Sequence, residues 1–224
     1  MSIFPDNYIS ASESEAGPSR YFKLGKLKDG ESTTIRLCGT FVSGHAICGY
    51  SYFTMEGRPR RFPTFPKDYL DDIGLTYEGK TKNTGEKDKP SFFLSWACLR
   101  KEAEDFQIID ISQKKVREQI EAILDMEDYN ILDGEMANFY LTIKRTGTGL
   151  DTNYTVVPTL KVAAKADQQR WADARADIFL PALYEGGDPF GGRPAEGGEA
   201  ACATPLTHRD ELGADKELMP SAGW

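Results

Sequence analysis

The chain has 224 residues, of which 40% are hydrophobic and 28% charged, and its formal net charge is −8. This length and composition are typical of a globular protein with one sizeable domain, with or without tails. No apolar run approaches the ~20 residues that span a bilayer, and residues 1–20 lack the apolar stretch of a signal peptide. We therefore expect a cytoplasmic protein.

The negative charge is concentrated at the two ends of the chain. Residues 20–165 carry 22 basic and 21 acidic side chains, whereas residues 166–224 carry 5 and 11. Residues 1–19 add three acids and no base. A nearly neutral body can still present a basic groove, so the net charge does not exclude binding to nucleic acid.

The first strands are predicted between residues 21 and 53. Residues 33–38 alternate between apolar and polar side chains, which places the apolar ones inward and Arg36 outward. Residues 41–53 are rich in β-forming side chains and contain two glycines, which predicts a bent or bulged strand or a hairpin.

A mixture of cations and aromatic rings follows at residues 58–66, and three prolines there argue against a regular strand. The cations are Arg58, Arg60 and Arg61, and the rings, together with two that precede the stretch, are Tyr50, Tyr52, Phe62 and Phe65. Single-stranded nucleic acid binds to such mixtures, because cations contact phosphates and ring faces stack on unpaired bases. The alternative is a loop whose rings join the core while its arginines are solvated.

The next segments are a polar insertion and a strand. Residues 69–89 are lysine-rich and polar, and we expect a mobile flap that either closes over bound DNA or only keeps the protein soluble. Residues 92–99 are apolar on both faces near their start, which predicts a central strand with Trp96 in the core.

Residues 106–157 predict a strand, a helix and a hairpin. The apolar run at residues 106–111 is long enough for one strand, and Ser112 is a candidate cap for a helix over residues 113–126. Alternation over residues 139–144 and β-branched residues at 153–157, separated by a glycine-containing turn, predict the hairpin.

The C-terminal quarter changes in composition. Residues 162–183 are alanine-rich and predict a helix that packs on the body, whereas residues 185–224 are acidic and rich in glycine and proline, which predicts a disordered tail. Residues 1–19 are likewise expected to be a disordered leader, which leaves residues 20–184 as the folded domain. The tail ends with apolar side chains at Leu218, Met219 and Trp224.

Candidate metal and catalytic residues are few. His45 and Cys48, with Cys38 and Cys98, could form a metal site, but no paired Cys spacing supports it and we favour reduced thiols. No nucleophile, dinucleotide-binding or cofactor motif is found, so we expect a protein that is not an enzyme. A metal-dependent nuclease using Asp68, Asp71 and Asp72 is the weaker alternative, because Asp-Asp in a turn after a proline is more often a solvated loop or a helix cap.

Three segments carry a resemblance to a known family. Residues 106–123 form a strand that leads into a Ser-Gln-Lys helix start, and residues 143–154 read Ile-Lys-Arg-Thr-Gly-Thr-Gly-Leu-Asp-Thr-Asn-Tyr. Residues 29–37, Asp-Gly-Glu-Ser-Thr-Thr-Ile-Arg-Leu, precede them. Together these segments resemble the bacteriophage single-stranded DNA-binding proteins over roughly residues 20–160.

The resemblance implies a mainly β fold with helices (α+β), an OB-like, partly open β-barrel that carries packed helices and a disordered acidic C-terminal tail. It implies sequence-independent binding and protection of single-stranded DNA during phage DNA replication, recombination and repair in the host cytoplasm. We expect the replication partners (polymerase, helicase or primase, and recombinase) to bind the apolar tip of the acidic tail. A non-enzymatic structural or virion interaction protein remains the other candidate.

The expected DNA contacts combine the cation and aromatic stretch with residues of the predicted strands. Arg36 and Lys144 are chosen because they face away from the apolar side of their strands. The full set is Arg36, Arg58, Arg60, Arg61, Lys144 and Arg145 for phosphates, and Tyr50, Tyr52, Phe62, Phe65 and Tyr140 for bases.

Overall fold

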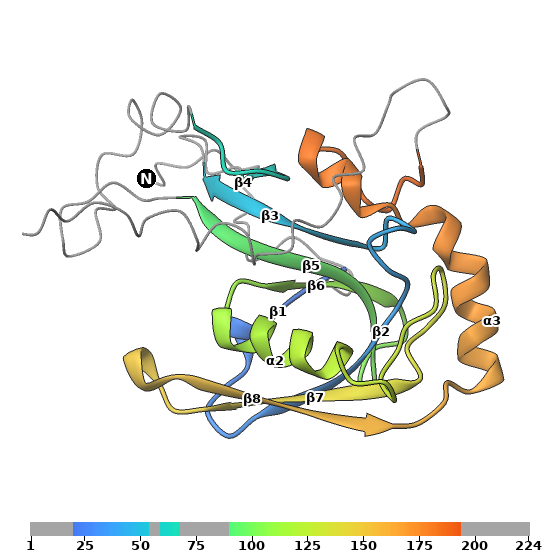
Figure 1. Cartoon of the computed structure of the whole chain (residues 1–224), viewed down its shortest axis with the longest axis horizontal. Helices are drawn as coiled ribbons and strands as arrows, with labels where there is room; N and C mark the ends of the chain where they lie inside the picture. Colours follow the sequence, from blue (N-terminus) through green and yellow to red (C-terminus); the bar gives the residue numbers. More distant parts are fainter. Residues whose placement is uncertain (1–19, 54–58, 68–89, 194–224) are drawn as a thin grey trace, which may run out of the picture.

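The computed structural model describes residues 20–53, 59–67 and 90–193 of the chain (Figure 1). These residues form a strand-rich mixed fold with two α-helices and several short 3₁₀ turns. The strands are β1 (Tyr21–Lys23), β2 (Ser32–Leu37), β3 (Ala46–Phe53), β4 (Pro59–Phe62), β5 (Ser91–Arg100), β6 (Phe106–Ile111), β7 (Phe139–Thr146) and β8 (Asn153–Leu160). The helical elements are η1 (Leu24–Lys26), α2 (Lys114–Leu124), η2 (Gly149–Asp151), α3 (Lys165–Ala174), η3 (Arg175–Asp177) and η4 (Leu180–Glu185).

All the strands belong to one sheet, which does not close into a barrel. Its order is β1-β6-β5-β2-β7-β8, and β3 joins it through β5 and carries β4 on its other side. Every pair is antiparallel except β1 with β6. The sheet curves strongly, so that β7 and β8 lie across from β3 and β5 with α2 between them (Figure 1). The prediction of an open, barrel-like α+β fold is confirmed at this level.

The long strand β5 is the centre of the sheet, as its two apolar faces predict. It pairs with β6 on one edge and with both β3 and β2 on the other. Trp96 lies in the core between the sheet and α2, whereas Phe93 and Leu99 lie in a second core on the opposite face. Both faces of β5 are thus covered, as the apolar residues on both sides of the strand predict.

Helix α2 covers the first core with the apolar stripe that its sequence predicts. Val116, Ile120 and Ile123 are buried there. The prediction that Ser112 caps the helix is wrong: the N-cap residue is Gln113, and its side chain makes no capping hydrogen bond. The first turn of α2 therefore has no side-chain cap.

The C-terminal segment covers the second core, but it does not form the single helix that residues 162–183 predict. Helix α3 ends at Ala174 and continues as the 3₁₀ turns η3 and η4. The carbonyl oxygen of Arg175 accepts a hydrogen bond from His45 Nε2 at 2.9 Å, and Ile178 N bonds to the same oxygen three residues back. Pro181 lies in the first turn of η4, where its missing N–H removes no helical hydrogen bond.

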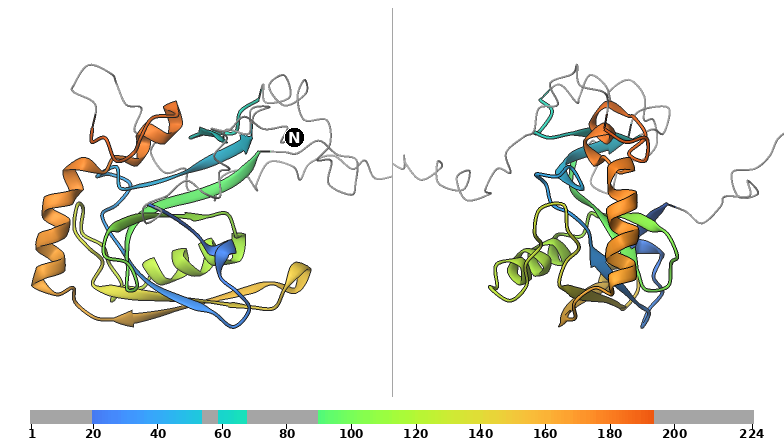
Figure 2. Two further views of the ribbon diagram at one scale, coloured as in Figure 1. Left: turned by 180° about the vertical axis from the view of Figure 1, so that it is seen from behind. Right: turned by 90° about the vertical axis from the view of Figure 1, so that its right-hand side faces the viewer.

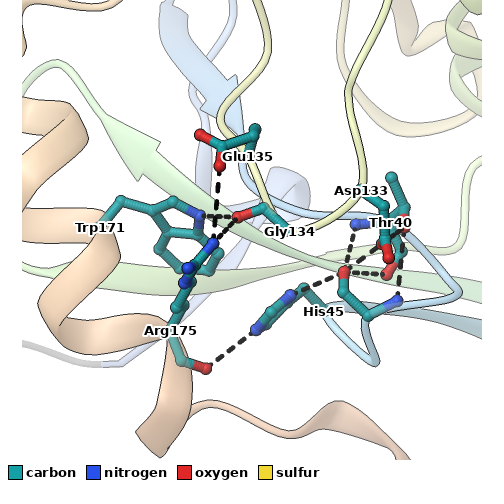
Figure 3. Close-up of polar contacts among 8 residues, drawn as sticks. Thr40, His45, Asp133, Gly134, Glu135, Trp171 and Arg175 are labelled. Atoms are coloured by element: carbon teal, nitrogen blue, oxygen red, sulfur yellow. Dashed lines mark hydrogen bonds and ion pairs between the residues drawn. The ribbon is translucent and has the colours of Figure 1, made fainter.

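A group of polar contacts fixes this segment to the sheet (Figure 3). Trp171 and Arg175 donate hydrogen bonds to the carbonyl oxygen of Gly134 at 2.9 and 3.1 Å, and His45 Nδ1 lies 2.8 Å from Ser43 Oγ. We call Ser43, His45, Gly134, Trp171 and Arg175 the C-terminal clasp. It explains why α3 lies against one end of the sheet (Figure 2).

The structure differs from the sequence prediction in two further places. Residues 59–62 form the strand β4 despite the prolines, because Pro59 is the first residue of the strand and Pro63 follows its end. Residues 185–193, expected in the tail, fold back on the body: Pro189 O accepts a hydrogen bond from Phe179 N at 2.7 Å, and the Phe190 ring contacts Tyr21.

Three predicted segments lie outside the described residues: the leader at residues 1–19, the insertion at residues 69–89 and the tail beyond residue 193. No described helix is long and apolar enough to cross a membrane.

Candidate nucleic-acid interface

The hairpin of β3 and β4 positions most of the aromatic residues that the sequence singles out. Tyr50 pairs with Phe62 across the two strands, and Tyr52 stacks on Phe62 with ring centroids 5.5 Å apart. Gly49 permits this close crossing, since a Cβ there would lie 2.0 Å from the Phe62 carbonyl oxygen. Tyr52 is buried, so it supports the hairpin rather than offering a free face.

Three rings continue from this hairpin onto β5 as a row of edge-to-face contacts. Phe65 lies 5.2 Å from Tyr50, and Tyr50 lies 5.4 Å from Phe92, measured between ring centroids. Phe65 is 45% exposed, and Tyr50 and Phe92 are half-buried. We call Phe65, Tyr50 and Phe92 the aromatic row. A half-exposed row of this kind can stack on planar ligands.

One cation contacts the aromatic row, and a second lies on the same hairpin opposite Tyr52. Arg117 of α2 lies over Phe92, 4.8 Å from the ring centroid, and donates hydrogen bonds to the carbonyl oxygens of Phe92 and Ser112 at 3.2 and 2.6 Å. Burial lowers the pKa of the Arg117 guanidinium from its ordinary value. Arg60, on β4, is exposed. Sequence reasoning missed Phe92 and Arg117, because only the fold brings β5 and α2 to this hairpin.

Arg61 points to the other face of β4 and is held there. Its guanidinium donates to Asp110 Oδ2 at 2.9 Å and to Ser95 Oγ at 3.0 Å, and it lies 4.9 Å from the Phe93 ring centroid. A phosphate would have to compete with this carboxylate for the same donors. Arg61 is therefore a poor phosphate ligand in this arrangement.

The expectation that Arg36 faces outward to solvent is wrong. Its side chain is fully buried, with the guanidinium 3.9 Å from the Tyr140 ring centroid and Nη1 donating to Ala137 O at 2.5 Å. Alternation correctly put Arg36 on the face opposite the first core, but Tyr140 covers it there. Arg36 cannot reach a phosphate unless Tyr140 moves.

The remaining predicted residues on β7 lie apart from the aromatic row and from one another. Tyr140 is half-buried at the start of the strand, beside the end of the molecule where α3 begins (Figure 1). Lys144 is exposed and lies opposite Ser32 and Thr155 in the sheet. Arg145 faces the other way, toward η1 and the first turn of α2. The predicted set is therefore divided among four places: the β3–β4 hairpin, the Arg36–Tyr140 contact, Lys144 and Arg145.

The predicted contacts at Arg58, Leu218, Met219 and Trp224 lie outside the described residues, as do the acids at positions 68, 71 and 72.

The candidate metal ligands do not come together as a metal site. Within the described ranges, no three His, Cys, Asp or Glu side chains are arranged to hold a metal ion. His45 is part of the C-terminal clasp, and burial lowers its pKa from the ordinary value. Burial raises the pKa of the Cys98 thiol to about 12 and also raises that of Cys38, so both thiols stay protonated at neutral pH.

Comparison of the chain with protein-family models, curated proteins and solved structures finds no match.

Proposed function

We propose that this protein is a bacteriophage-type single-stranded DNA-binding protein that covers and protects the strand, without sequence preference, during phage DNA replication, recombination and repair. The bases would stack on the aromatic row, and the exposed Arg60 and the half-buried Arg117 would face the sugar-phosphate backbone. The body would then be an OB-like, partly open barrel, in which the curved sheet and α2 supply the framework.

The observation that carries the proposal is the aromatic row itself. Phe65 is a large ring that is 45% exposed and lies in a row with two half-buried rings, with Arg117 over Phe92 at the end of the row and Arg60 opposite Tyr52 on the same hairpin. Structural aromatics normally bury their faces, because each ring contributes about 150–250 Å² of contact area. A row that keeps part of its ring surface exposed beside cations has the composition that unpaired bases require.

The segments that resemble phage single-stranded DNA-binding proteins also support the proposal. They form β2, β6 with α2, and the β7–β8 hairpin, which together build the framework of the first core. The resemblance thus covers β6, which pairs with β5, and α2, whose Arg117 contacts Phe92, but not the strands β3 and β5 that carry Tyr50 and Phe92.

A fluorescence titration with oligo-dT tests the proposal directly. The protein has three tryptophans and ten tyrosines, and stacking on Tyr50 should quench part of the tyrosine emission. We expect saturable binding. The logarithm of the binding constant should fall linearly with the logarithm of the salt concentration, with a slope of about −0.7 per phosphate contact. Absence of binding at both low and moderate salt would refute the proposal.

The alternative is a non-enzymatic structural or virion interaction protein. Exposed apolar side chains at Val157, Leu160 and Val162, which are 52%, 52% and 72% exposed, favour it because such side chains often mark protein contacts. An interaction protein of this kind should leave oligo-dT unbound. A magnesium-dependent loss of the oligonucleotide in the same titration would instead indicate a nuclease.

A further inference from the structure

A cavity of about 440 Å³ opens where η1, the first turn of α2 and the β7–β8 hairpin meet. The polar and charged side chains that line it are Gln113, Lys114, Lys115, Arg145, Thr152 and Asn153. No acidic side chain is among its described lining residues. The segments around Gln113 and Arg145 are two of those that the sequence singled out, and the fold brings them together at this one place.

The positive charge in this cavity is poorly neutralised. Arg145 donates only to uncharged oxygens, namely Leu27 O at 2.5 Å, Gly25 O at 3.2 Å and Thr152 Oγ1 at 3.4 Å. Lys114 pairs with Glu118 at 3.6 Å, but the two side chains are 80% and 57% exposed, so water and salt screen the pair. The cavity therefore has a net attraction for an anion.

The backbone of α2 adds to this attraction. Its N-cap makes no side-chain hydrogen bond, and its first turn holds no acidic residue. The peptide N–H groups at the start of a helix, together with the helix dipole, favour negative charge. Two buried atoms of lining residues, Gln113 Oε1 and Arg145 Nε, have no hydrogen-bond partner in the described part of the chain. A bound ligand that offers both acceptors and donors would satisfy such atoms.

The cavity and the aromatic row lie at the same end of the molecule. The start of α2, the β7–β8 hairpin and the adjoining ends of β3 and β5 are all on the left in Figure 1, and the reverse view agrees (Figure 2). Arg117 joins the two places, because it lies one turn into α2 and contacts Phe92. One strand of nucleic acid could therefore contact the row, the first turn of α2 and the cavity in succession.

We propose that this cavity binds a phosphate group of the single strand, with Lys114, Lys115 and Arg145 supplying the charge and Gln113 bonding to an adjacent base. This inference rests on the proposed function and extends it by giving the path of the strand. A backbone phosphodiester, a terminal phosphate and a free mononucleotide all carry the same chemical group. The experiment must therefore separate these three sources.

The first measurement is the salt dependence of oligo-dT binding by the full-length chain. The test variant is Lys114→Gln with Lys115→Gln, and the matched control is Lys101→Gln with Lys165→Gln, which removes two exposed lysines at the opposite end of the molecule. We expect the log–log slope to fall by about 1.4 in the test variant, since each phosphate contact on a single strand contributes about 0.7. The control should leave the slope within error of the unchanged protein.

The second measurement follows the backbone amides of residues 114–116 by NMR. Inorganic phosphate and dTMP should shift these amides in the unchanged protein and not in the test variant. If an oligo-dT without a terminal phosphate shifts them equally well, the ligand is a backbone phosphodiester. If only a 5′-phosphorylated oligo-dT or dTMP shifts them, the ligand is a terminal or free phosphate, and the proposed strand path is wrong.

The two proposals fail in different ways. If oligo-dT binds normally, the test variant matches the control and phosphate shifts no amide, the cavity is not a phosphate site while the proposed function stands. If phosphate and dTMP shift the amides but oligo-dT does not bind, the proposed function and the strand path both fall. Both replaced lysines are exposed, so loss of folding does not confuse these outcomes.

Discussion

Arg61 and Asp110 form an ion pair at 2.9 Å that joins β4 to β6, two strands that share no backbone hydrogen bonds. Their side chains are only 12% and 18% exposed. Ser95, on β5, one of the two strands between them, donates a hydrogen bond to the same carboxylate and accepts one from Arg61. The pair thus fixes the outer end of the hairpin against the body of the sheet, and with it the position of the aromatic row.

Neighbouring arginines on β4 should therefore behave differently when replaced. Arg61→Ala should lower the free energy of unfolding by about 2 kcal/mol, less than the ~3–5 kcal/mol for a fully buried pair, because it leaves Asp110 without its cation. Arg60→Ala should leave stability within ~0.5 kcal/mol, as expected for an exposed side chain. Urea denaturation of both variants measures this difference.

DNA binding should show the opposite difference between the two arginines: it should depend on Arg60 and not on Arg61. Arg60→Ala should flatten the salt dependence of oligo-dT binding by about 0.7, the value for one phosphate contact on a single strand. Arg61→Lys, which keeps the charge beside Asp110, should bind as the unchanged protein does. A flattened slope in Arg61→Lys together with an unchanged slope in Arg60→Ala would show that the assignment of the two side chains is reversed.

Stacking on the exposed ring of the aromatic row gives a second prediction. Phe65→Ala should weaken oligo-dT binding by about 1–3 kcal/mol, the usual effect of removing one base-stacking ring. The thermal midpoint should stay nearly unchanged, because Phe65 is 45% exposed. Phe65→Trp is the matched control and should preserve binding. Equal affinities for Phe65→Ala and Phe65→Trp would exclude this ring from the interface.

Much of the fold can be predicted from local patterns. The strand at residues 106–111 coincides with β6, and the predicted helix over residues 113–126 differs from α2 by only one or two residues at each end. Both rest on periodicity, which depends only on which face of an element is buried. Trp96 was correctly placed in the core for the same reason.

The failures share a different cause, which is that the outcome depends on contacts distant in the sequence. The alternating pattern correctly predicts the face of β2 on which Arg36 lies. It does not predict that Tyr140, more than a hundred residues later in the chain, covers the Arg36 side chain. Likewise, α3 ends next to Arg175, whose carbonyl oxygen accepts a hydrogen bond from the distant His45. In the candidate site, composition identified the rings of the hairpin, whereas Phe92 and Arg117 became visible only after the sheet was assembled.

The contact between Tyr140 and Arg36 changes what replacement of Tyr140 should do. From the sequence, Tyr140→Ala would weaken DNA binding without affecting stability. The ring instead covers a buried guanidinium, and a desolvated contact of this kind is worth about 2 kcal/mol. We therefore expect Tyr140→Ala to unfold at a lower urea concentration, and Tyr140→Phe, which keeps the ring, to match the unchanged protein. An equally stable Tyr140→Ala variant would contradict this account.

Gln119 protects the free edge of the sheet. Its amide accepts a hydrogen bond from Val156 N at 2.9 Å and donates one to Tyr154 O at 3.1 Å, in the manner of an additional strand. Pro158, two residues further along the same edge, has no N–H to offer. The edge strand β8 is therefore partly closed to pairing with another chain.

Removal of this amide should expose the edge. Gln119→Ala should lower the free energy of unfolding by about 1–2 kcal/mol, since it loses the hydrogen bonds to Val156 and Tyr154 as well as one to Lys115 O within α2, and should speed hydrogen exchange at the Val156 amide. Gln119→Glu keeps the acceptor for Val156 and loses the donor to Tyr154, so its exchange rate at Val156 should change less. Equal exchange rates in Gln119→Ala and the unchanged protein would mean that the edge is protected by other contacts.

The C-terminal clasp should make stability depend on pH near neutrality. Burial lowers the pKa of His45 in the folded protein below its ordinary value of 6.5. In the window between the two pKa values the unfolded chain binds a proton that the folded chain does not, so stability rises with pH there. The contribution of His45 is complete above pH ~6.5 and is lost as the pH falls through this window toward the folded pKa.

We therefore expect the unchanged protein to have a lower free energy of unfolding at pH 5.5 than at pH 7.5, whereas His45→Gln should show a flatter profile over this range. Carboxylates contribute little in this range, because their ordinary pKa values are ~3.9–4.3. The chain has only two histidines, so His208→Gln is the matched control and should keep the full pH dependence. The His45 ring lies 4.8 Å from Trp171, which makes tryptophan fluorescence a direct reporter of the clasp during urea denaturation. A His45→Gln variant with the pH dependence of the unchanged protein would show that another group titrates in this window and that His45 is not the cause.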